Sequence, residues 1–297
     1  MDGRELEQQV ERDAIDTVLV VFPDLHGRLV GKRVTGRWFV GHLLRGDGAI
    51  HACNYLMAVD VDMTPLPGYR FANWEQGYGD FAAVPDLGTL RRIPWLDKTA
   101  LVVCDLEDEA TGEPVEVSPR RILRRQVERA AAMGFAVKCG SELEFFLFKD
   151  SFEEAAAKRY QATSFAPTVI VWSYDNRTCG FRIIGHGPSL RVECRIPGAD
   201  ANPYMAFAAT IAAGLHGIEN KLELPPEFRG DAYTTPGLPR VPANLTEAIN
   251  ALETSQVARQ ALGDEVVEHY LHSARQERDR FDGAVTDWEL RRNFERI

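Results

Sequence analysis

The chain has 297 residues and a formal net charge of −10, with 45% hydrophobic and 26% charged residues. This composition is typical of a soluble globular protein, and the acidic balance argues against nucleic acid or an anionic membrane as the main partner. The five scattered cysteines, the charged N-terminus and the lack of a long apolar run predict reduced thiols, no signal peptide, no membrane span and a cytoplasmic location.

The first hundred residues are rich in predicted strands. Alternating or continuous apolar patterns that end in turn residues occur at 16–36, 51–63 and 99–107. The first of these reads as strand, tight turn and strand. A short helix is predicted over 37–46, and the Gly- and Pro-rich stretch 64–98 is predicted to be a long irregular excursion. Together these patterns predict a sheet-rich domain over residues 1–106.

Helical patterns dominate the second part of the chain, residues 107–297. Ser118 and Pro119 open a helix that is predicted to run to Gly134, and a strand is expected over 136–148. A strand-rich stretch is predicted over 167–198. Further helices are predicted at 151–160, 202–223, 244–263 and 264–297. Strands and helices that are segregated in this way indicate an α+β fold.

Two glutamates interrupt the apolar run "CGSELEFFLF" at 139–148. In a strand, Glu142 and Glu144 would share one face, while Leu143 and Phe145 would share the other. Two like charges on one face repel each other, so a cation is expected in front of them. A metal ion is one reading; an exposed sheet face and ion pairs with arginines are the others.

A second charged stripe lies in "RVECRIPG" at 191–198, where polar and apolar residues alternate. The stripe contains Arg191, Glu193 and Arg195, and the preceding strand pair adds Arg177 and Arg182. Arginine forks suit carboxylate and phosphate oxygens, which favours an anion site. A solvated sheet face with Arg–Glu pairs explains the same pattern. Taken with the acidic pair, the stripe suggests metal–phosphate chemistry.

Four segments together resemble the glutamine synthetase superfamily. They are "GSELEFFLF", "DNRTCGFRI", "RVECRIPGADANPYMAFAATIAAGLHGIENKL" and "GYGDFAAVPDLGTLRRIPW". The likeness is greatest to the actinobacterial branch that joins glutamate to organic amines such as polyamines or ethanolamine. It implies an N-terminal β-grasp domain over 1–106 and a catalytic domain with a curved antiparallel sheet over 107–297. It also implies a homo-oligomer, the double-ring dodecamer of the family.

The resemblance implies an ATP-dependent ligase of nitrogen metabolism. ATP would phosphorylate glutamate to γ-glutamyl phosphate, and an amine would displace phosphate, with Mg²⁺ or Mn²⁺ ions at the phosphates. The residues that match the family's motifs imply metal ligands at Glu142, Glu144 and Glu193. They imply ATP-binding arginines at Arg177, Arg182 and Arg191, and arginines that bind the glutamate substrate at Arg159 and Arg195. Arg159 and Arg177 are also implied to be catalytic.

The chain departs from the family pattern between its Glu-x-Glu segment and "KRYQATSFAP". The family's long middle section, with further metal ligands, the glutamate loop and a His-x-His-x-Ser strand, has no counterpart here. A section of about 100–200 residues is therefore expected to be missing around 149–167. No other histidines replace it, since His269 and His272 lie on a charged helix where solvation is the expected state.

Two further departures concern the amine. Residues 60–80 contain no Asp-Gly-Ser segment, and Phe165 occupies the position of the family's flap glutamate. Both acidic groups help members of the family to bind ammonium, so an organic amine is expected, with Phe165 and Trp74 as apolar surface for it. The alternative is a non-catalytic deletion variant that keeps only the fold and the oligomer contacts.

Overall fold

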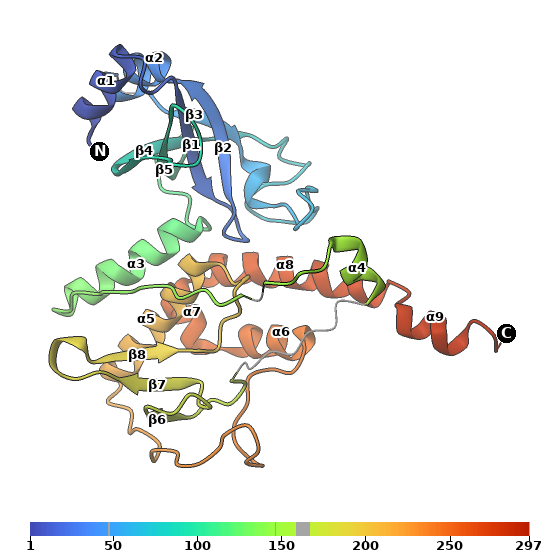
Figure 1. Cartoon of the computed structure of the whole chain (residues 1–297). Helices are drawn as coiled ribbons and strands as arrows, with labels where there is room; N and C mark the ends of the chain where they lie inside the picture. The colour runs from blue at the N-terminus through green and yellow to red at the C-terminus, as the bar shows by residue number, and fades with distance from the viewer. Residues whose placement is uncertain (47, 146, 159–166, 297) are drawn as a thin grey trace.

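Two separate β-sheets with a layer of helices between them make up the molecule, as Figure 1 shows. The structure is a computed structural model, and it describes residues 1–46, 48–145, 147–158 and 167–296. The N-terminal sheet and the C-terminal helices are linked by α3 (Pro119–Ala132). This arrangement of segregated sheets and helices confirms the predicted α+β fold class.

The first sheet has five strands in the order β2-β1-β5-β4-β3. The strands are β1 (Thr17–Pro23), β2 (Leu29–Thr35), β3 (Ile50–Cys53), β4 (Asp80–Arg92) and β5 (Thr99–Asp108). β1 pairs antiparallel with β2 and parallel with β5, so that Val18 lies opposite Ala100. The two strand patterns predicted at 16–36 and 99–107 therefore share one sheet, as expected for a self-contained unit.

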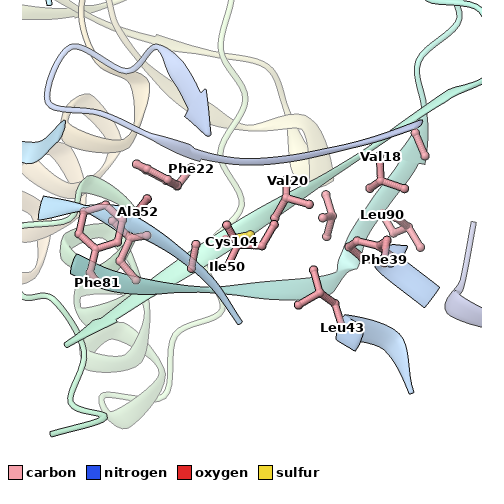
Figure 2. Packing of buried hydrophobic residues seen from close by; sticks show 14 of the residues in the cluster. Val18, Val20, Phe22, Phe39, Leu43, Ile50, Ala52, Phe81, Leu90 and Cys104 are labelled. Carbon is pink, nitrogen blue, oxygen red and sulfur yellow. The ribbon is translucent and has the colours of Figure 1, made fainter. Parts of the chain in front are cut away.

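One face of this sheet carries the main hydrophobic core, which Figure 2 shows. Val18, Val20 and Phe22 alternate along β1 and are all almost fully buried. Phe22 meets Phe81 of β4 edge to face, with ring centroids 5.1 Å apart. Leu6 of α1 (Gly3–Glu11) is fully buried and belongs to the same core. The apolar run in the sequence is thus a strand whose alternate residues Val18, Val20 and Phe22 belong to this core.

The predicted irregular excursion over 64–98 is wrong for its second half. Residues 80–92 form β4, which is the longest strand of the sheet and pairs with both β3 and β5. Its register shifts between Asp86 and Arg91, in the stretch that contains Gly88. A bulge tolerates residues such as glycine that break a regular strand. The Gly- and Pro-rich composition therefore predicted a loop, although pairing with β3 and β5 makes this stretch a strand. The strand predicted over 51–63 likewise ends at Cys53.

Several shorter helices complete the described structure. They are α2 (Gly36–Phe39), which continues as a π-helical turn over Val40–Leu44, α4 (Phe152–Ala157), α6 (Leu245–Thr254), α7 (Gln256–Leu262), α9 (Asp287–Asn293) and 3₁₀ turns over Asn54–Met57 and Gly187–Ser189. The helix predicted at 37–46 is observed, and the one predicted at 151–160 is observed over Phe152–Ala157, with residues 159–160 outside the described residues. The predictions of one helix at 244–263 and one at 264–297 are each wrong in part, because the first is interrupted at Ser255 and the second between Asp282 and Asp287. α3 starts after Ser118 as predicted, although the Ser118 hydroxyl makes no capping hydrogen bond.

The central helices pack through small and branched side chains. Ile122 of α3, Ala208 of α5 (Pro203–Glu219) and Val266 of α8 (Asp264–Asp282) form one buried cluster. Val267 and Leu271 on another side of α8 pack with Ile249 of α6. α8 is therefore the shared support of the helical layer. No helix in the described ranges is both long and apolar enough to cross a bilayer.

The second sheet is small and holds the charged stripe. It consists of β6 (Trp172–Tyr174), β7 (Phe181–Ile184) and β8 (Arg191–Cys194), with β6 parallel and β8 antiparallel to β7. β8 forms one edge of this sheet. The strand-rich character predicted over 167–198 is confirmed. The β-grasp assignment and the boundary after residue 106 stay predictions.

Candidate functional site

The centre of the candidate site is the pair Arg182 and Glu193. The two residues lie directly opposite each other across β7 and β8. Arg182 Nη1 donates a hydrogen bond to Glu193 Oε2 at 3.0 Å, and only 6% of the Arg182 side chain is exposed. The alternation of β8 places Glu193 on the charged face, as the sequence predicted.

Two more arginines surround Glu193 from its own strand and just beyond it. Arg191 Nη2 donates to Glu193 Oε1 at 3.1 Å, and Arg195 Nη1 lies 3.8 Å from Glu193 Oε2. Burial would raise the pKa of the Glu193 carboxyl, but the hydrogen bond from Arg182 and the charges of the three arginines hold that pKa below its ordinary value. Glu193 is thus a carboxylate whose oxygens are already engaged by cations.

Asp175 completes the cluster, although it was not among the residues predicted to form a site. Arg182 Nε donates to Asp175 Oδ1 at 3.1 Å, and a second guanidinium nitrogen contacts the same oxygen. The hydrogen bond that Arg182 donates to Asp175, followed by the one that it donates to Glu193, raises the pKa of Arg182 against the effect of burial. Asp175 has a positive φ of 47°, which its place in the turn after β6 requires. An acidic residue in an Asp-Asn turn between charged strands was the only available signal for this contact.

The cluster has a surplus of positive charge that can bind an anion. Four arginines face two carboxylates, and Arg177 is exposed at the rim, where its charge contributes to lowering the pKa of Asp175 after the larger effect of Arg182. The Nε atom of Arg195 is buried and, within the part of the chain that the structure describes, has no hydrogen-bond partner. A phosphate or carboxylate oxygen would suit this donor. The predicted Arg–Glu pairs are therefore confirmed, and the anion site stays a prediction for the same cluster.

The acidic pair Glu142 and Glu144 is not placed on a strand. The predicted strand over 136–148 is wrong: residues 135–145 join neither sheet, and both glutamates are exposed. Figure 1 shows this stretch as an extended trace that leaves α3 and leads to α4. Leu143 and Phe145 are 68% and 84% exposed. A strand needs a neighbouring strand for its backbone hydrogen bonds, and no strand among the described residues pairs with this segment.

The metal ligands that the family likeness implies do not fit a metal ion in this arrangement. Among the described residues, which include Glu142, Glu144 and Glu193, no group of three His, Cys, Asp or Glu side chains could hold an ion. Glu193 forms ion pairs with arginines, and Glu142 and Glu144 are exposed to solvent. Mg²⁺ requires near-octahedral oxygen coordination, which this arrangement leaves to water.

Three other expected residues lie outside the site or outside the described residues. Arg159 and Phe165 lie outside the described residues. Trp74 is 71% exposed, and its ring packs edge to face on Tyr78 with centroids 4.8 Å apart. The described part of the chain therefore adds no apolar amine pocket to the arginine cluster.

The prediction that His269 and His272 are solvated is wrong for His269. This side chain is buried, and its Nε2 atom donates to the carbonyl oxygen of Met57 at 2.8 Å. His272 bonds the carbonyl oxygen of Pro67 at 2.7 Å. Both histidines pack on Tyr69, so they fasten α8 to the loop after β3. Because charged residues surround His269 in the sequence, the buried face of this helix was not predicted.

Comparison with known proteins identifies the family. The glutamine synthetase catalytic-domain family matches residues 116–158 and 155–293. The chain is 35% identical to the gamma-glutamylethanolamide synthetase GlnA4 of Streptomyces coelicolor, with coverage of 99% of this chain and 96% of that protein. It is 25% identical to a glutamate–isopropylamine ligase of a Pseudomonas species, with 97% of both chains covered. A solved structure of GmaS without ligand shares the fold, with a TM-score of 0.71, 18% identity and coverage of 96% of this chain and 98% of that one.

The comparisons also bear on the missing section. The alignment with the Streptomyces protein runs over 445 positions, and since this chain has 297 residues, at least 148 of those positions face a gap. The two stretches that match the catalytic-domain family meet at 155–158. Both observations support the predicted shortening around 149–167.

Proposed function

This chain belongs to the glutamine synthetase family, and on that basis we propose that it derives from, and retains the anion-binding part of, an ATP-dependent ligase that joins glutamate to an organic amine. The names of two relatives support an organic amine as the substrate, since one is an ethanolamide synthetase and the other an isopropylamine ligase. The single observation that carries the proposal is the cluster of three arginines around Glu193.

The proposed chemistry has two steps. The γ-phosphoryl group of ATP moves to an oxygen of the glutamate side chain, and the bond to ADP breaks. The amine nitrogen then attacks the carbonyl carbon, phosphate leaves with the electrons of the C–O bond, and the nitrogen loses a proton. Positioned cations carry most of the catalysis in such a phosphoryl transfer, because the transition state spreads negative charge over oxygens.

The arginines have different accessibilities, which suggest different parts in that chemistry. Arg177 and Arg191 are exposed and are the proposed contacts for ATP phosphates. Arg195, with its unpartnered Nε, is the proposed contact for the glutamate carboxylate. Arg182 is buried between Asp175 and Glu193. Its proposed contribution to the nucleotide site is therefore its positive charge, from a buried position next to the exposed arginines. A role for Arg159 is proposed from the matching segment alone.

Ligases of this family use ATP and a divalent metal ion. Because the described carboxylates do not fit such an ion, no step of the proposal is assigned to Glu142 or Glu144. The preference for an organic amine is supported by the absence of Asp-Gly-Ser from residues 60–80 and by Phe165 in place of an acid. An apolar ring gives no charge to hold ammonium but suits an alkyl group.

A second candidate function is a non-catalytic copy of the ligase, and one observation favours it. The segment that carries Glu142 and Glu144 is exposed and pairs with no described strand. In the alignment with the Streptomyces protein, at least 148 positions have no residue of this chain. Such a chain would retain the fold and the anion cluster without completing the reaction.

One assay separates the two candidates. Purified chain is incubated with ATP, glutamate, Mg²⁺ and either ethanolamine, isopropylamine or ammonium, and phosphate release is followed. Release that depends on both glutamate and amine, is lost in Arg195→Gln and is kept in Arg33→Gln supports the ligase. Arg33 is an exposed arginine on β2 and serves as the matched control. A folded protein that releases no phosphate with any amine supports the non-catalytic copy.

A further inference from the structure

Residues 136–145 are an extended segment whose backbone is free to bind another strand. Within the described ranges, no backbone N–H or C=O of this segment is hydrogen-bonded to the protein. The segment alternates acidic and apolar side chains from Glu142 to Phe145, and all four are exposed. An alternating, exposed segment of this kind has the character of an unpaired strand rather than of a loop.

In the part of the chain that the structure describes, β8 has a free edge with a matching pattern. Arg195 N–H donates to the carbonyl oxygen of Gly180, and Glu193 lies opposite Arg182, so the odd-numbered residues of β8 direct their backbone groups toward β7. Because these directions alternate in an antiparallel pair, the backbone groups of Val192 and Cys194 point away from β7, toward the open edge. β8 therefore offers donors and acceptors to one further strand.

The side chains of the two elements are complementary as well. A strand added beside β8 places its side chains on the same two faces as those of β8. With Glu142 and Glu144 on the face of Arg191, opposite charges meet. Leu143 then shares the other face with Val192, which is 61% exposed. A one-residue slip would instead put carboxylates beside Val192, so the charge pattern fixes the register.

We propose that two copies of this chain associate by reciprocal strand addition, in which residues 139–145 of each copy pair with the free edge of β8 in the other. Every copy carries both halves of the contact, so a two-fold axis satisfies two segments and two edges at once. Backbone hydrogen bonds would provide the association and the charge stripe its specificity. The proposal does not depend on whether the chain is an active ligase.

Two proline variants test the two halves of the contact separately. Leu143→Pro removes an N–H from the exposed segment, where the fold has no hydrogen bond to lose. Val192→Pro removes the N–H that points away from β7, a position where an edge strand tolerates proline. Val192→Thr keeps that N–H, and Phe152→Ser removes an equally exposed aromatic ring outside the segment, so these two variants are the matched controls.

The masses of the full chain and of each variant are measured by sedimentation velocity from micromolar to near-millimolar concentration. The expected result is a dimer mass for the native chain and both controls, and a monomer mass for each proline variant. A mixture of the two proline variants retains one intact segment and one intact β8 edge, so it is expected to form a weaker heterodimer. A monomeric native chain, a dimer that persists in Leu143→Pro, or a mixture that stays monomeric would each overturn the proposal. Circular dichroism spectra that match the native chain confirm that the variants are folded.

Discussion

His269 Nε2 lies 2.8 Å from the carbonyl oxygen of Met57, so a hydrogen bond joins α8 directly to the turn that follows β3. Since a carbonyl oxygen can only accept, Nε2 is the protonated nitrogen of the ring. The ring is 5% exposed and lies against Tyr69, with ring centroids 4.6 Å apart. The junction between the N-terminal part and the helical layer therefore contains a buried, neutral histidine.

This histidine predicts a pH dependence of stability. Burial, helped by the neighbouring charge of His272, lowers the pKa of His269 from 6.5 to about 4 despite the bond to Met57. Between these values the unfolded chain binds more protons than the folded one, so the free energy of unfolding falls as the pH falls from about 6.5 to about 4. The full difference corresponds to about 3 kcal/mol.

The measurement is urea unfolding of the native chain and of His269→Gln across this pH window. Glutamine keeps an N–H donor for Met57 but cannot titrate, so its free energy of unfolding should fall less on acidification. His272→Gln controls for the loss of a ring against Tyr69. Parallel pH profiles for the native chain and His269→Gln would contradict the prediction.

Arg182 is expected to contribute to stability through its buried ion pairs. Arg182→Met leaves Glu193 with only Arg191 and Arg195 as partners, and the free energy of unfolding should fall by about 2 kcal/mol. The cost is moderate because Glu193 keeps those two cations. Arg177→Gln, in the exposed turn of the same sheet, should change stability by less than about 0.5 kcal/mol. Equal effects of the two substitutions in thermal or urea unfolding would argue against the pairing.

Metal binding by the free chain is expected to be weak. Glu142 and Glu144 are exposed and Glu193 is engaged by arginines, so most of an ion's coordination shell would be water. Calorimetric titration with Mn²⁺ should show no tight, stoichiometric site, and Glu144→Gln should give the same titration as the native chain. A stoichiometric site that Glu144→Gln abolishes would show that the segment closes over the cluster when metal is present.

Little or no ligase activity is expected of the isolated chain. Misplacement of a catalytic group by about 1 Å can cost about a hundredfold in rate, and here a section with several such groups has no counterpart. Phosphate release from ATP in the presence of glutamate and ethanolamine should therefore stay at the level of the Arg195→Gln variant. An amine-dependent rate well above that of the variant would show that the shortened chain retains a working site.

An intact relative that has phenylalanine at the position of Phe165 and lacks Asp-Gly-Ser is expected to prefer an alkylamine over ammonium. Two acidic groups that would hold ammonium are missing, and an aromatic ring offers carbon surface in their place. The comparison is of kcat/KM for ammonium and ethanolamine. Replacement of that phenylalanine by glutamate should shift the preference toward ammonium, and a clear ammonium preference of the unmodified relative would refute the prediction.

The sequence by itself determined those features that depend on neighbours along the chain. The apolar run from Val18 to Phe22 indicated a strand, and Ser118 and Pro119 marked the start of α3. The alternation of Arg191, Glu193 and Arg195 placed all three on one face of β8. Side-chain periodicity and helix-end signals are local, so they need no knowledge of the rest of the fold.

Whether a predicted strand is paired, or a side chain buried, is decided by tertiary contacts. The alternation around Glu142 and Glu144 resembles that of β8, yet among the described residues the segment is unpaired because the hydrogen bonds of a strand are made by another strand. β4 shows the reverse case, since two neighbours hold a strand together across its bulge. His269 is buried because a distant turn covers it. Pairing and burial depend on segments far apart in the sequence, and local patterns do not record which of them meet.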